Sequence, residues 1–187
     1  PLRSINLDDV EKSTIKELQF LTSKPVMYIA NTNEDEVKGN KHTERLKQYA
    51  QNEGSQVVTI CASIESEIAL LDGDDKHEFL MDIGQTEPGL NRVIRGGYDL
   101  LGLQTFFTAG PNEVRAWTTK INATAPKAAA EIHTDFERGF IRAEVISFQD
   151  FISKEGEQGA KEAGLLRLEG KEYIVKEGDI MHFRFNV

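Results

Sequence analysis

A strand–helix–strand pattern in the first third of the chain constrains the fold more than any other feature. Residues 26–30 (VMYIA) and 57–61 (VVTIC) are short, continuous apolar runs, a pattern typical of strands that are covered on both faces. The polar stretch 41–53 between them has helical periodicity, and Gly54 follows where a left-handed residue commonly ends a helix. Two strands joined by a helix over so short a span should be parallel. We therefore predict a βαβ unit.

The remaining predicted elements divide the chain into a mainly helical first part and a strand-rich second part. Helical spacing predicts helices over residues 7–22, 64–71, 74–83 and 88–101. After about residue 103 alternating strand patterns take over, at residues 105–108, 113–119, 140–148, 173–175 and 180–185, with helices at 124–132 and 159–164. The fold class that we expect is α/β followed by α+β, with a boundary near Leu103.

Composition excludes several classes of protein. The chain has 187 residues, 39% hydrophobic and 28% charged, as in ordinary soluble domains. No apolar run approaches the roughly 18 residues of a membrane helix, so we expect a cytoplasmic protein with no membrane partner. The net charge of -9 gives neither half the basic excess of a duplex binder, and nucleic-acid contact would have to be local. The single Cys61 excludes an internal disulfide and a cysteine-built metal site.

Polar residues follow both predicted strands directly. Asn31, Thr32, Asn33 and Glu34 come after the first strand, and Ala62 and Ser63 follow the second. Ligands of open α/β sheets bind outside the carboxyl ends of parallel strands. An Asn side chain can serve the donor and acceptor edges of a purine, but it can equally pin one loop to another. The pattern therefore indicates either a ligand crevice or purely structural capping.

Three other polar clusters fail on spacing. His77 lacks a second His four residues on, so there is no zincin motif. The stretch Asp72–Asp75 does not place its Gly as a calcium loop does. His133 beside Asp135 has no nucleophile pattern around it, so we expect a structural hydrogen bond. We predict no metal site in this chain.

Several long motifs together resemble the YchF group of Obg-related P-loop NTPases, the Obg-like ATPases. The similarity covers essentially the whole chain, and the resemblance is to the C-terminal half of such a protein. It is carried by the stretches KPVMYIANTNED, CASIESEI, EPGLNRVIRGGYDLLGLQTFFTAGPNEVRAWT, TAPKAAAEIHTDFERGFIRAEVISF and EGDIMHFRFNV.

The resemblance implies a domain organisation and a fold. Residues 1–23 would end a helical, coiled-coil insertion, and residues 24–80 would form the C-terminal part of the G domain, with its parallel sheet and helices. Residues 81–103 would be connecting helices, and residues 104–187 a TGS domain, which is a small β-grasp module. We expect the chain to be monomeric.

The resemblance also implies a purine-reading loop. Asn31 to Glu34 stand where other GTPases carry Asn-Lys-x-Asp, and residues 61–63 would be the second base loop, contributing backbone N–H groups. An Asp-length carboxylate accepts both donors of the guanine N1/N2 edge, which adenine cannot offer. Replacement by Glu34 should weaken guanine selection, and the family accordingly uses ATP as well as GTP. The expected nucleotide-base contacts are Asn31, Thr32, Asn33, Glu34, Ala62 and Ser63.

The hydrolytic parts of such an enzyme are not found in this sequence. The chain contains no Gly-x-x-x-x-Gly-Lys-Ser/Thr loop, which is the motif that cradles the phosphates, and no switch regions or Mg²⁺ ligands are recognisable. We therefore expect no catalytic residue in this chain. The intact protein would hydrolyse ATP or GTP with Mg²⁺, and this chain alone would be inactive.

The second half, as a TGS domain, would be a binding platform, and the family is linked to ribosomes. The alternative function is a nucleotide-independent ribosome- or RNA-binding module, although the aromatic residues can equally be core. Candidate contacts to ribosomal protein or RNA are Arg115, Trp117, Lys127, Arg138, Arg142 and Arg184.

Overall fold

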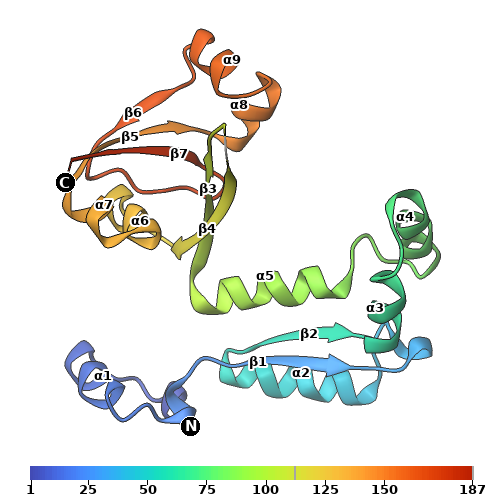
Figure 1. Cartoon of the computed structure of the whole chain (residues 1–187). Coiled ribbons are helices and arrows are strands. Elements are labelled where there is room, and N and C mark those ends of the chain that lie inside the picture. The colour runs from blue at the N-terminus through green and yellow to red at the C-terminus, as the bar shows by residue number, and fades with distance from the viewer. Residues whose placement is uncertain (112, 187) are drawn as a thin grey trace. The chain divides into compact units, whose positions relative to one another are not determined.

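The computed structural model describes residues 1–111 and 113–186, which form two compact units that divide between Leu101 and Gly102. The α-helices and strands of both are labelled in Figure 1. Each unit has its own sheet and its own buried cluster.

The first unit is built on the predicted βαβ motif. Strands β1 (Met27–Asn31) and β2 (Gln56–Ile60) are parallel, and α2 (Lys41–Glu53) connects them. Asn40 begins α2 by accepting hydrogen bonds from the backbone N–H groups of His42 and Thr43, at 2.8 and 3.0 Å. Gly54 ends it in the left-handed region, at φ 69°. The prediction of a parallel pair is confirmed.

The other elements of this unit are helical. They are η1 (Leu2–Ser4), α1 (Asp9–Lys16), η2 (Leu21–Ser23), η3 (Glu34–Glu36), α3 (Ala62–Ile68), α4 (Gly73–Asp82) and α5 (Gly89–Leu101). The predicted helix over 7–22 is too long, because α1 ends at Lys16 and Gln19 has φ 48°. Leu21 is 81% exposed, so its side chain gains little from burial that could stabilise the extra turns.

Helix α5 packs differently from its apolar pattern. Leu90 and Ile94 are 58% and 50% exposed, although an apolar stripe predicts burial. The helix contacts β1 and β2 at Gly96, where an added Cβ would lie 2.7 Å from Met27 Sδ. Close approach at this glycine decides which face meets the sheet. Cys61 is buried in a small cluster with Ile64, Ile68 and Leu80.

The second unit is a mixed five-stranded sheet in the order β4-β3-β7-β5-β6. Strands β3 and β7 are parallel, and the other pairs are antiparallel. The strands are β3 (Leu103–Ala109), β4 (Val114–Lys120), β5 (Phe140–Ile146), β6 (Arg167–Glu169) and β7 (Ile180–Phe185). The helices are α6 (Ala125–Ile132), α7 (Thr134–Arg138), α8 (Phe148–Ser153) and α9 (Glu157–Glu162).

Two predicted strands of this unit are shorter in the structure. The strand over 140–148 ends at Ile146, because the Ser147 hydroxyl accepts the N–H of Asp150 and begins α8. Residues 173–175 make only an isolated bridge, Thr124 to Ile174. The predicted structural hydrogen bond of His133 is confirmed, since its Nδ1 accepts the Asp135 N–H at 3.1 Å and begins α7.

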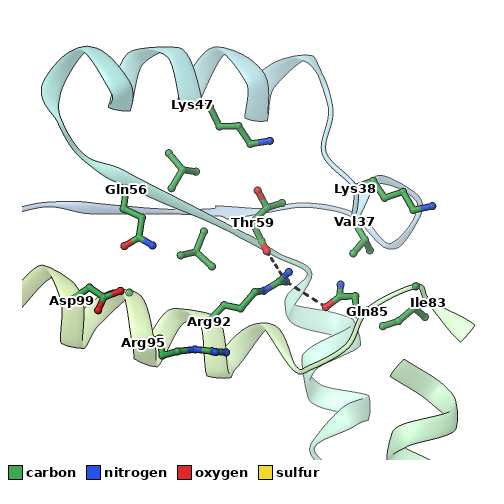
Figure 2. A pocket seen from close by; sticks show the side chains of 14 residues that line it. Val37, Lys38, Lys47, Gln56, Thr59, Ile83, Gln85, Arg92, Arg95 and Asp99 are labelled. Atoms are coloured by element: carbon green, nitrogen blue, oxygen red, sulfur yellow. Dashed lines mark hydrogen bonds between the residues drawn. The ribbon is translucent and has the colours of Figure 1, made fainter. Parts of the chain in front are cut away.

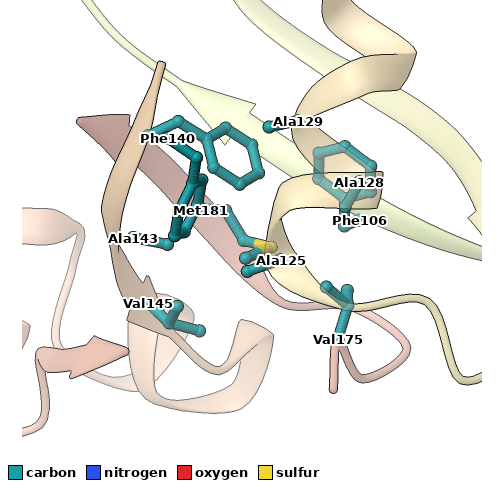
Figure 3. Close-up of a cluster of buried hydrophobic side chains, with 10 residues drawn as sticks. Phe106, Ala125, Ala128, Ala129, Phe140, Ala143, Val145, Val175 and Met181 are labelled. Atoms are coloured by element: carbon teal, nitrogen blue, oxygen red, sulfur yellow. The ribbon is translucent and has the colours of Figure 1, made fainter. Parts of the chain in front are cut away.

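The core of the second unit lies between the sheet and α6. Ala125, Ala128 and Ala129 of α6 are fully buried and let the helix approach the aromatic residues of the strands (Figure 3). The buried set is Phe106, Ala125, Ala128, Ala129, Phe140, Ala143, Val145, Val175, Met181 and Phe183. Helix α6 contacts β4 and β5, and α7 contacts β5 and β7. One face of the sheet is therefore covered.

Asp179 is a buried acid in this unit. It is 2% exposed, and its Oδ2 accepts hydrogen bonds from Tyr173 Oη at 2.7 Å and from the Lys176 N–H at 2.9 Å. Arg167 lies 3.6 Å from its other oxygen. Burial, with the bond to Asp179, raises the pKa of Tyr173 to about 12. Two side chains and one backbone N–H therefore keep the carboxylate satisfied inside the fold.

Residues 1–111 and 113–186 include no helix that is both long and apolar enough to cross a membrane. Across the same residues there is no group of three or more His, Cys, Asp or Glu side chains arranged to hold a metal ion.

Candidate functional site

The carboxyl ends of β1 and β2 bring two predicted loops together. Asn31 pairs with Ile60 in the parallel register, so the residues that follow each strand begin side by side. The Asn31 Oδ1 atom accepts a hydrogen bond of 3.0 Å from the backbone N–H of Ala62, the first residue of α3. Thr32 is 8% exposed, and its N–H and hydroxyl both donate to the Ile60 carbonyl, at 2.8 and 3.1 Å.

A second bond joins the same loops nearer to solvent. The Ser63 hydroxyl donates to Glu34 Oε1 at 2.9 Å, and its oxygen lies 3.1 Å from Cys61 Sγ. Glu34 begins η3 and projects a carboxylate over the start of α3. Two separate contacts thus hold the loops at one relative position.

These residues surround a shallow pocket of about 430 Å³. Its lining contains five of the six residues predicted to contact a base, together with Asp35. The sixth, Ala62, is not in the lining, but its backbone N–H donates to Asn31. The lining residues are Asn31, Thr32, Asn33, Glu34, Asp35 and Ser63. The carboxylates and amide oxygens are hydrogen-bond acceptors suited to the amino and imino donors of a purine edge.

The same bonds also agree with structural capping. Asn31 and Glu34 each have an intramolecular partner, and a bound base would have to share or replace these contacts. Both interpretations of the polar cluster therefore remain, and the base-binding role of the six residues stays a prediction.

Glu65 lies on α3, two residues after Ser63, and was not among the predicted site residues. Its Oε1 accepts the N–H of Gly89 at 2.8 Å, and its Oε2 accepts the N–H of Leu90 at 3.0 Å. These are the first residues of α5, so one carboxylate on α3 satisfies two N–H groups at the start of another helix. The only sequence signal was an acid two residues after Ser63, which does not reveal a partner 24 residues away.

The predicted ribosome contacts fall on two faces of the second sheet. Arg115 lies with its guanidinium carbon 4.2 Å from the centre of the Trp117 ring. Trp117 packs against the core cluster and donates from Nε1 to Thr108 Oγ1 at 2.9 Å. Since residues two apart on a strand share a face, Arg115 lies on the side of the sheet that carries α6.

The opposite face carries Arg142 and Arg184, which are directly paired on β5 and β7. Arg184 donates to both carboxylate oxygens of Glu144, at 3.2 Å each. The hydrogen bond from Arg184 holds the pKa of Glu144 below its usual value. Arg142 and Arg184 therefore form a local basic spot around one acid.

The remaining predicted contacts lie on α6 and α7. Lys127 pairs with Glu137 at 2.6 Å, and Arg138 lies 3.9 Å from Asp135. Phosphate groups would compete with these carboxylates. The structure thus separates the six residues rather than gathering them into one patch, and their role stays a prediction.

The comparisons with known proteins follow the same division of the chain. Residues 103–186 match the family of the YchF-GTPase C-terminal domain, described as a protein of unknown function. The whole chain is 65% identical over 186 residues to the ribosome-binding ATPase YchF of Pasteurella multocida, and 51% identical over 190 residues to that of Bacillus subtilis. The chain belongs to the YchF family. The resemblance seen in the sequence is confirmed.

The YchF relatives are longer than this chain. The alignments cover 100% of the chain but 51% and 52% of these two relatives, so the chain spans about half their length. The activity and partners of the whole relatives are therefore not carried over as findings.

Solved structures agree with the mixed α/β fold. The Schizosaccharomyces pombe YchF GTPase is 31% identical, with a TM-score of 0.84, over 98% of this chain and 50% of that one. A GTP binding protein from Pyrococcus horikoshii OT3 is 20% identical, with a TM-score of 0.60, over 88% of this chain and 46% of that one. The second likeness shows the fold alone.

Proposed function

We propose that this YchF-family chain is the base-recognising and TGS half of a ribosome-associated ATPase, which hydrolyses ATP, and also GTP, in the intact protein. The curated relatives are named ribosome-binding ATPases. The observation that carries the proposal is the hydrogen bond from the Ala62 N–H to Asn31, which joins two strand-end loops around one pocket. Such a junction is the ligand position of open α/β sheets.

Glu34 gives this pocket its base preference in the proposal. Its carboxylate is held by Ser63, which leaves its second oxygen to accept from one amino group. Adenine offers a single amino group, whereas guanine offers paired N1 and N2 donors that a shorter Asp accepts together. Asn31 can accept from the adenine amino group while donating to the neighbouring ring nitrogen. The site therefore accepts adenine without excluding guanine.

Phosphate and Mg²⁺ chemistry is assigned to other parts of a longer protein. This sequence has no Walker A loop, and the parts of the chain seen in the structure include no cluster of carboxylates or imidazoles fit for a metal. In the proposal the strand-end residues offer acceptors to a base, and no Mg²⁺ ligand is assigned to this chain. We expect the chain alone to release no phosphate from ATP.

The second unit, in this proposal, is a TGS domain with a β-grasp fold that contacts the ribosome. Its mixed sheet packs on α6, as a β-grasp sheet packs on its helix. Arg142 and Arg184 supply the basic spot on the face of the sheet opposite α6. The assignments of residues 1–23, 24–80, 81–103 and 104–187, a cytoplasmic location and a monomeric state are parts of the same proposal.

A second candidate is a nucleotide-independent ribosome- or RNA-binding module. It is favoured by the intramolecular partners of Asn31 and Glu34, which satisfy both side chains without a base. Under this candidate the first unit serves only as a scaffold.

Calorimetry separates the two candidates. The chain is substituted for the matching half of a YchF relative, and ATP and GTP affinities are measured with and without Asn31→Ala. Weaker binding of both nucleotides supports the proposal. Unchanged affinity and selectivity, in a variant with normal thermal stability, would leave the nucleotide-independent module as the function.

A further inference from the structure

A larger pocket lies along the other edge of β2, within the first unit. It has a volume of about 600 Å³ and is lined by residues 56–59 of β2. Helix α2 borders it on one side of the strand and α5 on the other (Figure 2). Residues 83–85, between α4 and α5, close one end. We call it the β2 slot.

Backbone groups on the outer edge of β2 face this slot. The Ile60 carbonyl accepts the Thr32 N–H, so residue 60 points toward β1. Backbone groups alternate in direction along a strand, so Val57 and Thr59 point the other way. The Thr59 carbonyl confirms this direction, because it accepts from Arg92 Nη2 at 3.1 Å on the outer side. The N–H and C=O of Val57 and the N–H of Thr59 are therefore presented to a neighbour, as on any open strand edge.

The slot is basic although the unit is acidic. Four of the eleven Lys and Arg residues of residues 1–101 line it, against one of the eighteen Asp and Glu residues. The cations are Lys38, Lys47, Arg92 and Arg95, and the acid is Asp99. Glu44 and Glu87 pair with Lys47 and Arg95 from outside the lining, which reduces but does not reverse the positive charge.

Arg92 is held at the back of the slot. Its Nη2 donates to the Thr59 carbonyl and, at 3.3 Å, to Gln85 Oε1. Its Nε is buried and has no partner among residues 1–111 and 113–186. Figure 2 shows this side chain crossing from α5 toward β2, with Lys47 on the opposite side of the strand. A guanidinium held in this way places a fixed positive charge beside the slot, and such a charge attracts a carboxylate.

We propose that the β2 slot binds an extended acidic peptide segment of a partner protein, which adds to the sheet as a third strand beside β2. The peptide backbone pairs with Val57 and Thr59. Its acidic side chains, which point alternately to the two faces of the sheet, meet the cations of α2 on one side and of α5 on the other. Main-chain pairing supplies affinity in this mode of recognition, and the flanking charges select the sequence. The slot is separate from the proposed base pocket, since the two share no lining residue.

The test is an NMR titration of the full chain with three capped hexapeptides. The first, the Glu–Val peptide, is Val-Glu-Glu-Glu-Glu-Val, so that a strand presents Glu on both of its faces. The second replaces each Glu by Lys, and the third is the Glu–Val peptide with every Glu N-methylated, which blocks both of its edges. We expect the first to shift the amides of residues 56–59 and of α5, and the other two to bind at least about tenfold more weakly. The methylated peptide keeps its charge but loses backbone pairing, so it separates strand addition from simple ionic attraction.

Two protein variants test the same contacts from the other side. Val57→Pro removes an outward N–H without touching the ladder to β1, a position at which an edge strand tolerates proline. We expect it to weaken binding about fivefold, the effect of one net hydrogen bond. The double variant Lys47→Gln, Arg95→Gln should weaken binding of the Glu–Val peptide by a similar factor. The loss should be larger at low salt than at high salt. Unchanged circular dichroism would show that each variant is folded.

Three outcomes of the peptide titration overturn the proposal. The first is that about 1 mM of the Glu–Val peptide shifts no amide signal of the protein. The second is that its methylated form binds equally well. The third is that the shifted amides lie only on another surface. Inorganic phosphate added at a matched charge concentration covers the remaining alternative. If phosphate alone reproduces the shifts of the peptide, the slot is an anion site and not a strand acceptor.

Discussion

Asn31 and Ala62 are joined by a hydrogen bond of 3.0 Å across two loops that follow neighbouring parallel strands. The bond uses the carbonyl oxygen of the Asn31 side chain and the first N–H of α3. It fixes how close the loops lie before any ligand binds. A base pocket assembled in this way would need little reorganisation, because its two sides are already connected.

Replacing Asn31 by Ala should expose the Ala62 amide. Loss of one net hydrogen bond is worth about 1 kcal/mol, so local opening and hydrogen exchange at Ala62 should become about fivefold faster. Asn31→Asp keeps an acceptor oxygen and should preserve the protection. Unchanged exchange in Asn31→Ala would show that the bond does not hold the loops.

Shortening Glu34 to Asp should move the chain toward guanine. The change removes the reach needed for the Ser63 hydrogen bond and restores the carboxylate length that accepts two donors together. In the protein that carries the matching half of a relative, we expect the ratio of GTP to ATP affinity to rise about tenfold. Glu36→Asp makes the same change in η3, outside the pocket lining, and should leave the ratio unaltered.

Ribosome sedimentation should locate the contact face of the second unit. Arg142→Ala removes a cation from the face of the sheet opposite α6, and we expect about a fivefold loss of affinity at low salt that shrinks as salt rises. Glu144→Gln should strengthen binding, because it releases Arg184 from its carboxylate partner. Lys154→Ala is the control, because it also removes one positive charge but at another position, the end of α8. Equal losses for Arg142 and Lys154 would indicate general attraction and no defined face.

The second unit should lose stability at alkaline pH through Tyr173. Its folded pKa is raised to about 12 from an ordinary value of 10.0. The folded state therefore holds this proton where the unfolded state releases it, so the stabilisation is complete below pH 10 and is lost as pH rises toward 12. Urea unfolding followed by Trp117 fluorescence, repeated at several pH values, measures how steeply the free energy of unfolding falls with pH.

Tyr173→Phe is the matched variant for this titration. It removes the hydroxyl that donates to the buried Asp179. We expect the free energy of unfolding to fall by about 1–3 kcal/mol at neutral pH and to depend less on pH in the alkaline range. A slope identical to that of the original chain would assign the alkaline transition to another group.

Much of this structure follows from local sequence. The period of the apolar residues predicts the two parallel strands, and Asn40 and Gly54 mark both ends of α2, because caps depend only on neighbours along the chain. The polar residues after β1 and β2 meet for the same reason, since parallel strands end at one edge. The YchF motifs, being long, identify the family without coordinates.

Other features required the tertiary structure. The apolar stripe of α5 predicts burial of Leu90 and Ile94, yet the helix meets the sheet at Gly96, where the absence of a Cβ permits close approach. Local pattern cannot reveal this, because the side of a helix that packs depends on the surface it meets. Glu65 binding the start of α5 and Arg92 binding the Thr59 carbonyl join residues 24 and 33 positions apart. The sequence by itself determined the strands, the caps and the family, which are local or motif properties, and only the folded chain decided which distant side chains meet.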